Sequence, residues 1–265
     1  MDTLPLDDRG LAYGDGLFET VLLRDGQPLL WREHLARLQR GAERLGFAAP
    51  DADSLRACCA EAPAGLAVLK LIVTRGSGGR GYRPPAEASP QLRWQVGAFT
   101  PQPERWRDGV RVRHCRLRLG RQPALAGIKH LNRLENVLAR SEWQDDAIAE
   151  GLLSDSHGLL VEATCMNLFW SRHGRLETPR LENCGVAGTL REALLAELAI
   201  SEVEAGPAVL LDAEAVWLGN SLQGLWPLVR LDDAQGECLR RWTLDARHRL
   251  LQDAAHALLG YPSPR

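Results

Sequence analysis

The sequence predicts an α+β fold in two domains, and two observations lead to this prediction. Short strand-like runs and amphipathic helices are mixed along the chain, without the regular strand–helix alternation of a doubly wound sheet. The chain also has 265 residues, 45% of them hydrophobic, whereas a typical domain has about 100 to 150 residues. We therefore expect two hydrophobic cores rather than one.

The expected first domain, residues 1–107, contains one clear helix and two strands. Apolar residues recur at steps of three and four through residues 31–46, which is typical of an amphipathic helix. Residues 66–74 and 92–99 are β-rich runs, and in the second run apolar and polar residues alternate. The pattern lapses at prolines and a glycine within residues 100–109, so we place the domain boundary near residue 107.

The expected second domain, residues 108–265, begins with a strand and a helix. The strand starts at Val110, and its apolar phase slips by one residue near His114, which indicates a β-bulge. A helix with leucines on one face is predicted to begin at or just after Lys129. Lys129 is therefore expected at a strand-to-helix junction.

The sequence pattern in the remainder of this domain predicts hairpins followed by helices. Runs of strand character separated by turn residues predict an antiparallel meander through residues 147–154, 159–171 and 176–178. Apolar periodicity predicts helices at residues 189–199 and 244–259.

Composition narrows the classes of function. A net charge of -2, from 32 basic and 34 acidic residues, provides no sustained positive field, so nucleic acid is not expected as a partner. Six cysteines without C-x-x-C spacing, and an N-terminus without a signal-peptide pattern, favour reduced thiols in the cytoplasm. No apolar run approaches the roughly 20 residues that span a bilayer, so we expect no membrane association.

Lysine usage identifies candidates for chemistry. Of the 32 basic residues only Lys70 and Lys129 are lysines, and the other 30 are arginines. A guanidinium stays protonated, whereas a desolvated amine can lose its proton and attack a carbonyl carbon. A lysine retained in such a chain is thus a candidate nucleophile, with survival on the surface by chance as the alternative.

A glycine-rich segment at residues 75–82 fits G-x-G-x-x-G after a strand. A dinucleotide fingerprint would open a helix, which the Tyr-Arg-Pro-Pro sequence from Tyr82 prevents, and an RNA-binding segment is not expected from a single occurrence in a near-neutral chain. We expect a loop from which Arg80 and Tyr82 can reach an anionic substrate. A plain surface turn is the alternative.

Two further motif searches give negative results. Residues 219–223 approach the G-x-S-x-G nucleophile elbow, but Gln223 replaces the last glycine and Pro227 discourages the helix that should follow. The seven histidines include no H-E-x-x-H pattern. We therefore expect neither serine hydrolase chemistry nor a metal site.

Two segments could hold an anion and a cation, respectively. Residues 185–191 form a turn into a helix, where main-chain N–H groups and the helix dipole would favour a phosphate, although any helix needs a cap. Glu162 lies in the apolar strand 160–164, where a buried carboxylate requires a cationic partner. That partner could be an arginine or a protonated ring nitrogen.

Taken together, these segments resemble the fold-type IV family of pyridoxal phosphate enzymes, most closely its aminodeoxychorismate lyases. The resemblance implies a smaller N-terminal α/β sandwich domain and a larger, β-barrel-like C-terminal domain with helices. It spans nearly the whole chain and rests on the order and spacing of the segments 13–20, 33–38, 75–82, 126–135, 162–169 and 185–191.

The resemblance also assigns roles to residues. Lys129 would carry pyridoxal 5'-phosphate covalently, Glu162 would pair with its pyridine nitrogen, and Arg37 would bind its phosphate. The further cofactor contacts that it implies are Gly188, Thr189, Leu190, Asn220 and Ser221. The substrate carboxylates would be contacted by Lys70, Arg80 and Tyr82.

The activity implied is elimination of pyruvate from 4-amino-4-deoxychorismate, which leaves 4-aminobenzoate for folate biosynthesis, in a homodimer. Lys129 would remove the proton from the amine-bearing carbon and then act as the general acid. An aminotransferase of the same fold, of the D-amino-acid or branched-chain type, would share Lys129, Glu162 and Arg37. A non-catalytic binding or assembly protein that retains the fold is an alternative of another class.

Overall fold

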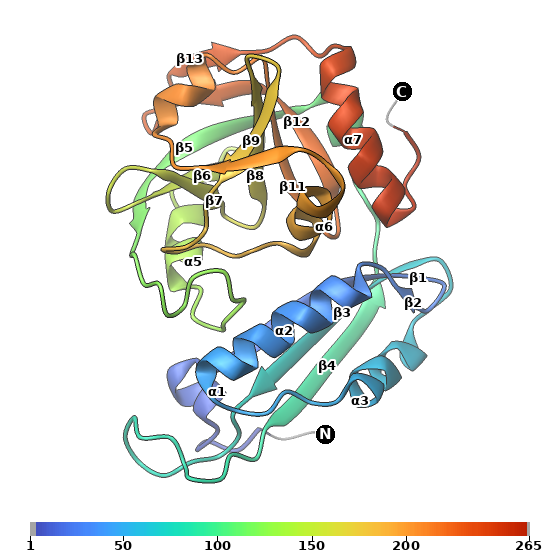
Figure 1. The fold of residues 1–265 in the computed structure, drawn as a ribbon, viewed down its shortest axis with the longest axis vertical. Coiled ribbons are helices and arrows are strands. Elements are labelled where there is room, and N and C mark those ends of the chain that lie inside the picture. Colours follow the sequence, from blue (N-terminus) through green and yellow to red (C-terminus); the bar gives the residue numbers. More distant parts are fainter. Residues whose placement is uncertain (1–3, 264–265) are drawn as a thin grey trace. The chain divides into compact units, whose positions relative to one another are not determined.

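The computed structural model describes residues 4–263, and its contacts divide the chain into two compact units (Figure 1). The first unit comprises Met1–Thr100 and Ile128–Asn132, and the second comprises Pro101–Gly127 and Arg133–Arg265. Both units mix helices with sheets, which confirms the predicted α+β class. The boundary expected near residue 107 falls inside helix α4 (Pro103–Asp108), within the second unit.

The first unit is built on an antiparallel sheet with the strand order β2-β1-β3-β4 (Figure 1). Its strands are β1 (Gly16–Arg24), β2 (Gln27–Pro28), β3 (Leu66–Thr74) and β4 (Gln91–Ala98). The strand predicted at residues 66–74 is confirmed with the same bounds, and the strand predicted at 92–99 begins and ends one residue earlier. The remaining elements of this unit are α1 (Arg9–Tyr13), α2 (Trp31–Leu45), α3 (Ala52–Ala57) and the 3-10 turn η1 (Cys58–Glu61).

Helix α2 covers one face of this sheet and packs on β1. It buries Leu38 and Ala42, as the periodicity predicts, and ends at Gly46, whose φ of +75° terminates the helix in the left-handed conformation. Because side chains alternate along a strand, Leu17 and Glu19 of β1 point to the face that carries α2. The intervening Phe18 points to the opposite face.

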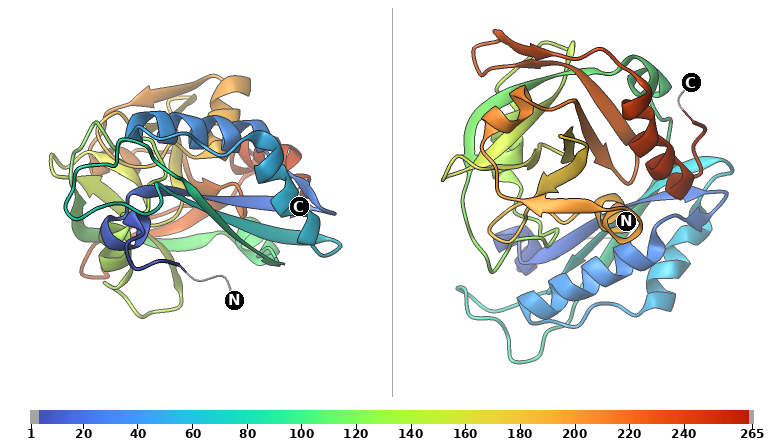
Figure 2. Two further views of the ribbon diagram at one scale, coloured as in Figure 1. Left: turned by 90° about the horizontal axis from the view of Figure 1, so that it is seen from below. Right: turned by 45° about the horizontal axis from the view of Figure 1, so that its top comes forward.

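The second unit contains a sheet of nine strands within the part of the chain that the structure describes. Its order is β10-β9-β8-β11-β12-β5-β6-β7, with β13 also paired to β12, and the sheet curls into a half-barrel (Figure 2). The strands are β5 (Val110–Leu119), β6 (Ile148–Asp155), β7 (Leu160–Ala163), β8 (Asn167–Arg172), β9 (Arg175–Pro179), β10 (Ile200–Val203), β11 (Ala215–Asn220), β12 (Gly224–Asp232) and β13 (Cys238–Arg241).

The topology of this sheet corrects the predicted simple meander. The strand predicted at residues 159–171 is divided into β7 and β8 by the turn at residues 164–166, and β8 pairs with β9 and β11 rather than with β7. Strand β5 runs parallel to both β6 and β12. The irregularity predicted near His114 is present, because the pairing of β5 with β6 shifts register between His114 and Arg118.

The helix expected at or just after Lys129 begins later, as α5 (Leu134–Arg140). Residues 129–131 are instead extended and hydrogen-bond to β1, so their backbone groups cannot enter a helix. The apolar face of α5 is exposed, with Leu134 at 76% and Leu138 at 60%. Lys129 therefore lies in an extended segment, not at the first turn of a helix.

The other helices of the second unit position its sheet connections. The predictions for residues 189–199 and 244–259 are confirmed as α6 (Thr189–Glu197) and α7 (Ala246–Leu259), with the 3-10 turn η2 (Pro207–Leu211) between them in sequence. Asp245 and His248 form a capping box at the start of α7. Helix α4 occupies the segment that was predicted to be an irregular linker. Within residues 4–263, no helix is both long and apolar enough to cross a membrane.

Four of the six cysteines are buried, and Cys165 and Cys238 are exposed. Burial raises the pKa of Cys115 and of Cys184 to about 12. Both thiols pack in the same core cluster of the second unit, with Trp143 and Leu153. These two cysteines are therefore protonated packing residues at neutral pH.

Candidate active site

Lys129 is fixed by the edge of strand β1. His130 forms an antiparallel bridge with Leu17, the Phe18 N–H donates to the Lys129 carbonyl at 3.0 Å, and the Leu131 N–H donates to the Gly16 carbonyl at 3.0 Å. These contacts extend the sheet of the first unit by one short strand-like segment. The backbone of the candidate nucleophile is thus as well anchored as a sheet residue.

The ammonium of Lys129 lies over an aromatic ring, with Nζ 4.4 Å from the centre of the Phe18 ring. The other lysine, Lys70, is exposed on β3 and pairs in register with Thr20 of β1. Because Phe18 and Thr20 are two residues apart, Lys70 is on the sheet face opposite α2, the face to which Phe18 points. Lys129 lies at the edge of β1, and its charge also acts on His34 of α2, whose pKa it helps to lower.

Arg37 lies on the face of the sheet that carries α2, in a buried cluster with Glu19 and His34. Its Nε donates to Glu19 Oε1 at 2.8 Å, its Nη2 donates to Glu19 Oε2, and His34 Nδ1 donates to Glu19 Oε2 at 2.6 Å. The exposed fractions are 5% for Arg37 and 1% for each of the other two residues. Two parallel hydrogen bonds from one guanidinium to one carboxylate fix the plane of Arg37.

The charge state of this cluster follows from its contacts. Burial would raise the pKa of Glu19, but the charges and hydrogen bonds of Arg37 and His34 outweigh it and hold the pKa at about 2. Burial also lowers the pKa of His34, against the attraction of Glu19. At neutral pH Glu19 is therefore a carboxylate and His34 a neutral hydrogen-bond donor.

The predicted substrate residues Arg80 and Tyr82 are exposed on the loop between β3 and β4. The loop opens no helix after residue 82, as Pro84 and Pro85 predict, and this agrees with the rejection of a dinucleotide fingerprint. At the base of the loop, Arg75 is buried and pairs with Asp15.

In the second unit, Glu162 is buried in β7 with an exposed fraction of 5%, as its apolar neighbours predict. Its Oε2 accepts the Val186 N–H at 2.9 Å, and the Val186 carbonyl accepts from Asn167 Nδ2 at 2.9 Å. Val186 is therefore held between two polar side chains, and Glu162 is joined directly to the turn that leads into α6.

That turn is too tight for side chains at two glycines. Gly185 has a φ of +84°, and a Cβ on it would lie 2.6 Å from Val161 Cγ1. A Cβ on Gly188 would lie only 1.9 Å from Asn167 Oδ1. Gly188 is the N-cap of α6, so the helix start at Thr189 and Leu190 presents main-chain N–H groups without a capping side chain from residue 188.

Asn220 and Ser221 occupy the turn between β11 and β12. Asn220 Oδ1 accepts the N–H groups of Leu222 and Gln223, and its Nδ2 donates to the Cys165 carbonyl at 3.2 Å. Because Gly219 pairs with Asn167, this turn lies beside the Glu162–Val186 contact within the second unit. The structure thus brings together Glu162, Gly188 and Asn220, which are far apart in the sequence.

Sequence reasoning missed two polar residues at these positions, Glu19 and Asn167. Glu19 carries a detectable signal, since it is an isolated acidic residue in the apolar run of residues 16–23, where burial demands a cationic partner. Asn167 carries no such signal. Its role depends on the pairing of β8 with β11 and on the close approach of Gly188.

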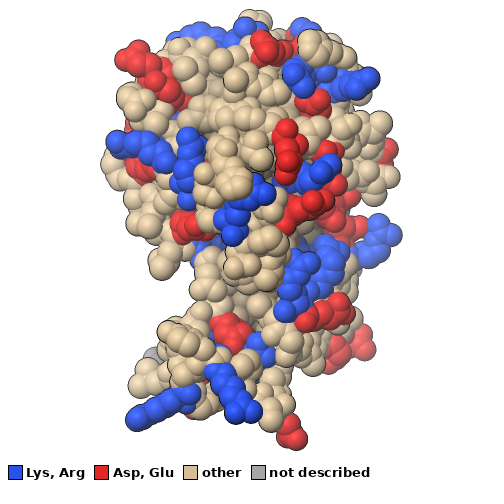
Figure 3. Space-filling view, turned by 60° about the vertical axis from the view of Figure 1, so that its left-hand side comes forward, with Lys and Arg blue, Asp and Glu red and all other residues tan. Residues whose placement is uncertain are grey.

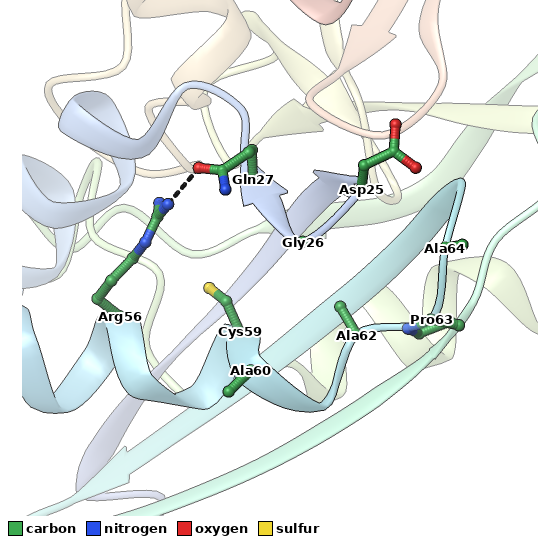
Figure 4. Close-up of a pocket in the computed structure, with 9 residues that line it drawn as sticks. All are labelled: Asp25, Gly26, Gln27, Arg56, Cys59, Ala60, Ala62, Pro63 and Ala64. Carbon is green, nitrogen blue, oxygen red and sulfur yellow. Dashed lines mark hydrogen bonds between the residues drawn. The ribbon is translucent and has the colours of Figure 1, made fainter.

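A pocket in the first unit lies at the β1–β2 turn and η1 (Figure 4). Small side chains from Cys59 to Ala64 form much of its lining, and the guanidinium of Arg56 hydrogen-bonds to Gln27 at one end. None of the predicted site residues lines this pocket. The only thiol of the lining belongs to Cys59, and burial raises its pKa, so it stays protonated at neutral pH.

On the face drawn in Figure 3, groups of basic and acidic side chains lie side by side, and uncharged areas separate them. Within the described part of the chain, no group of three or more His, Cys, Asp or Glu side chains is placed to hold a metal ion. The candidate residues themselves supply an amine, a buried carboxylate and main-chain N–H groups that can bind an anion.

Comparison with known proteins places this chain in a family. The family described as amino-transferase class IV matches residues 16–231. An aminodeoxychorismate lyase from Vibrio harveyi is 35% identical over 233 residues, which cover 85% of this chain and 86% of that protein. A putative branched-chain-amino-acid aminotransferase from Methanocaldococcus jannaschii is 29% identical over 85% of this chain and 81% of its own length.

A solved structure extends the likeness to the whole fold. The crystal structure of 4-amino-4-deoxychorismate lyase from Pseudomonas aeruginosa is similar with a TM-score of 0.86 and 44% sequence identity, covering 97% of this chain and 96% of that one. The match over residues 16–231 and the likeness to the relatives in sequence and fold agree, and the chain belongs to the amino-transferase class IV family.

Proposed function

We propose that this protein is a 4-amino-4-deoxychorismate lyase that releases pyruvate and 4-aminobenzoate. The structural observation that carries the proposal is the placement of Lys129, one of only two lysines, on an anchored backbone beside β1. The likeness to the lyases of Vibrio harveyi and Pseudomonas aeruginosa supports the choice of substrate.

The described residues fit pyridoxal 5'-phosphate as the cofactor. The glycine turn at Gly185 and Gly188, which a Cβ would obstruct, leads into the first turn of α6, where the main-chain N–H groups of Thr189 and Leu190 are suited to bind a phosphate. We assign the phosphate to these groups together with Arg37, Asn220 and Ser221, the pyridine nitrogen to Glu162, and the covalent bond to Lys129. When bound, the cofactor would withdraw electrons from the substrate carbon that carries the amine.

The residues of this chain then have defined tasks. Lys129 Nζ removes the proton from the amine-bearing carbon of the substrate and returns a proton as the enolpyruvyl group leaves as pyruvate. Glu162, held by its hydrogen bond from the Val186 N–H, would stabilise a positive charge at the ring nitrogen. Lys70, Arg80 and Tyr82 bind the substrate carboxylates.

We also propose that the enzyme works in the cytoplasm as a homodimer and that its product feeds folate synthesis. The exposed leucines of α5, Leu134 and Leu138, together with Val137 at 57% exposure, provide an apolar face suited to a second copy.

A branched-chain or D-amino-acid aminotransferase is the second candidate, favoured by the relative from Methanocaldococcus jannaschii. It would return the proton to the cofactor and release a keto acid instead of an aromatic product. Assay of the purified protein with 4-amino-4-deoxychorismate separates the two. We expect 4-aminobenzoate and pyruvate in equal amounts, and a roughly thousandfold or greater loss of rate in Lys129→Arg.

If the protein formed a keto acid from an amino acid and formed no 4-aminobenzoate, it would be an aminotransferase and not a lyase. Absence of both products from protein that contains the cofactor would leave a non-catalytic binding protein. Lys70→Arg is the matched lysine variant: because Lys70 is proposed to bind a substrate carboxylate, we expect KM to rise while kcat stays within about twofold of the wild type.

A further inference from the structure

The loop between β3 and β4 is fastened along its base to the N-terminal segment. The Arg9 N–H donates to the Gly76 carbonyl at 3.0 Å, and the Gly78 N–H donates to the Asp7 carbonyl at 3.3 Å. Asp8 and Ser77 form an antiparallel bridge between these bonds. A glycine-rich segment that would be mobile by itself is thus paired with the chain just before and within α1.

The side chain of Arg9 reaches further, to the part of the loop that carries Tyr82. Arg9 is 3% exposed, and it donates to the Tyr82 carbonyl at 3.0 Å, to the Gly81 carbonyl at 3.2 Å and to the Arg83 carbonyl at 3.5 Å. One planar guanidinium therefore donates hydrogen bonds to three consecutive carbonyl groups. A lysine in its place has fewer donors and no fixed fork with which to do this.

The carboxylate of Asp15 binds Arg9 through a salt bridge. Its Oδ2 accepts from Arg9 Nε at 2.8 Å and from Arg75 Nε at 2.7 Å, while Arg75 also donates to the Gly46 carbonyl at the end of α2. Burial would raise the pKa of Asp15, but its bonds to Arg75 and Arg9 outweigh this and lower it. The anchor of the loop is therefore an ionised network that includes the end of the principal helix of the unit.

Aromatic rings and a close contact at Gly78 also fix the position of the Arg9 side chain. The Arg9 guanidinium lies 5.0 Å from the centre of the Tyr13 ring, and the Tyr13 and Tyr82 rings meet edge to face at 5.3 Å. A Cβ on Gly78 would lie 2.7 Å from Arg9 Cδ, so glycine is needed for the side chain to pass. Tyr82 is 84% exposed and Arg80 is also exposed, so both side chains project from a fixed loop.

We propose that Arg9 is a positioning residue for substrate recognition: it fixes residues 81–83 so that Arg80 and Tyr82 meet a substrate with more than one carboxylate. The inference rests on the proposed function, in which this loop contacts the substrate. Arg9 itself touches no reacting atom. Its loss should weaken substrate binding more than turnover, because pre-ordering of a binding loop removes an entropic cost of association.

The test is Arg9→Lys in the full chain with its cofactor, followed by two measurements. Steady-state kinetics with 4-amino-4-deoxychorismate should show KM raised about tenfold with kcat within about twofold. Native-state trypsin digestion should show about tenfold faster cleavage of the Arg80–Gly81 bond, which reports the loop without any need for activity. The Arg83–Pro84 bond resists trypsin, so the nick is assigned unambiguously by mass.

Arg56→Lys is the matched control, because Arg56 is also an arginine of the first unit but hydrogen-bonds to Gln27 instead of residues 81–83. It should leave KM and the nicking rate within about twofold of the wild type. If Arg9→Lys does not fold, Gly78→Ala provides the second variant, since its Cβ displaces the Arg9 side chain. The same rise in KM and in nicking is expected.

Unchanged nicking in a folded Arg9→Lys or Gly78→Ala protein would overturn the anchoring role. Faster nicking with unchanged KM would overturn the role in substrate recognition. A wild-type protein that forms no 4-aminobenzoate would refute the proposed function alone, because the nicking measurement still reports whether Arg9 holds the loop.

Discussion

The first unit holds its candidate residues by charged side chains, whereas the second unit holds its own by main-chain donors and glycine contacts. Arg37 is fixed by two hydrogen bonds to Glu19, and Lys129 lies over the Phe18 ring. In the second unit, Glu162 accepts a main-chain N–H, and Gly188 admits no Cβ beside Asn167.

The difference predicts different sensitivities. A buried ion pair responds to pH and fails when either partner is removed, because the remaining charge is left in a low-dielectric environment. A turn built from main-chain donors keeps its hydrogen bonds at any moderate pH, because N–H groups do not titrate there. It is, however, sensitive to a single added methyl group. The first unit should thus be vulnerable to changes of charge and the second to changes of volume.

Glu19→Gln tests the first half of this comparison and should have the largest effect on stability. It leaves Arg37 buried without its carboxylate, and we expect a loss of roughly 3 kcal/mol in the free energy of unfolding at neutral pH. The measurement is denaturant unfolding monitored by tryptophan fluorescence. A loss within error of zero would show that Glu19 and Arg37 are not coupled as described.

The pH dependence of that loss sharpens the same test. The pKa of Glu19 falls on folding from an ordinary value of 4.5 to about 2, so its contribution is fully present above about pH 4.5 and is lost as the pH falls towards 2. The difference in stability between the wild type and Glu19→Gln should therefore shrink over that window. Glu33→Gln, in an exposed ion pair of α2 with Arg32, is the control and should show little change.

Gly188→Ala tests the second half and should have a smaller effect. Its Cβ would lie 1.9 Å from Asn167 Oδ1, so the turn before α6 must shift, and we expect the dissociation constant for pyridoxal 5'-phosphate to rise about tenfold. Titration of the cofactor-free protein followed by absorbance measures this constant. Gly97→Ala, where a Cβ meets nothing within 4 Å, is the matched control. If the two variants bound pyridoxal 5'-phosphate equally well, Gly188 would not be part of the phosphate-binding turn.

Local patterns predicted the helices and strands whose periodicity is strong, such as α2 and β3, because one buried face imposes a regular spacing of apolar residues. The same reasoning failed for α5. The leucines that suggested a packed helical face are exposed, and the residues before them pair with β1, which is distant in the sequence. Hydrogen bonds made by a distant strand leave no trace in the local pattern.

The candidate site shows the same limit. Lys129 is conspicuous in a chain with two lysines, and Glu162 in an apolar strand, so composition and burial are sufficient to find them. Asn167 and the anchoring role of Arg9 depend on contacts between segments far apart in the sequence, and only the fold brings those segments together. The chemistry-bearing residues were therefore easier to predict than the residues that position them.

Borohydride reduction followed by peptide mass analysis tests whether Lys129 carries the cofactor. Reduction fixes the cofactor on the amine that holds it, and the chain offers only two lysine side chains, Lys129 and Lys70. We expect the added mass on the peptide that contains Lys129 and loss of the visible absorbance band in Lys129→Arg. Added mass on the Lys70 peptide, or an unmodified Lys129 in protein that retains bound cofactor, would contradict it.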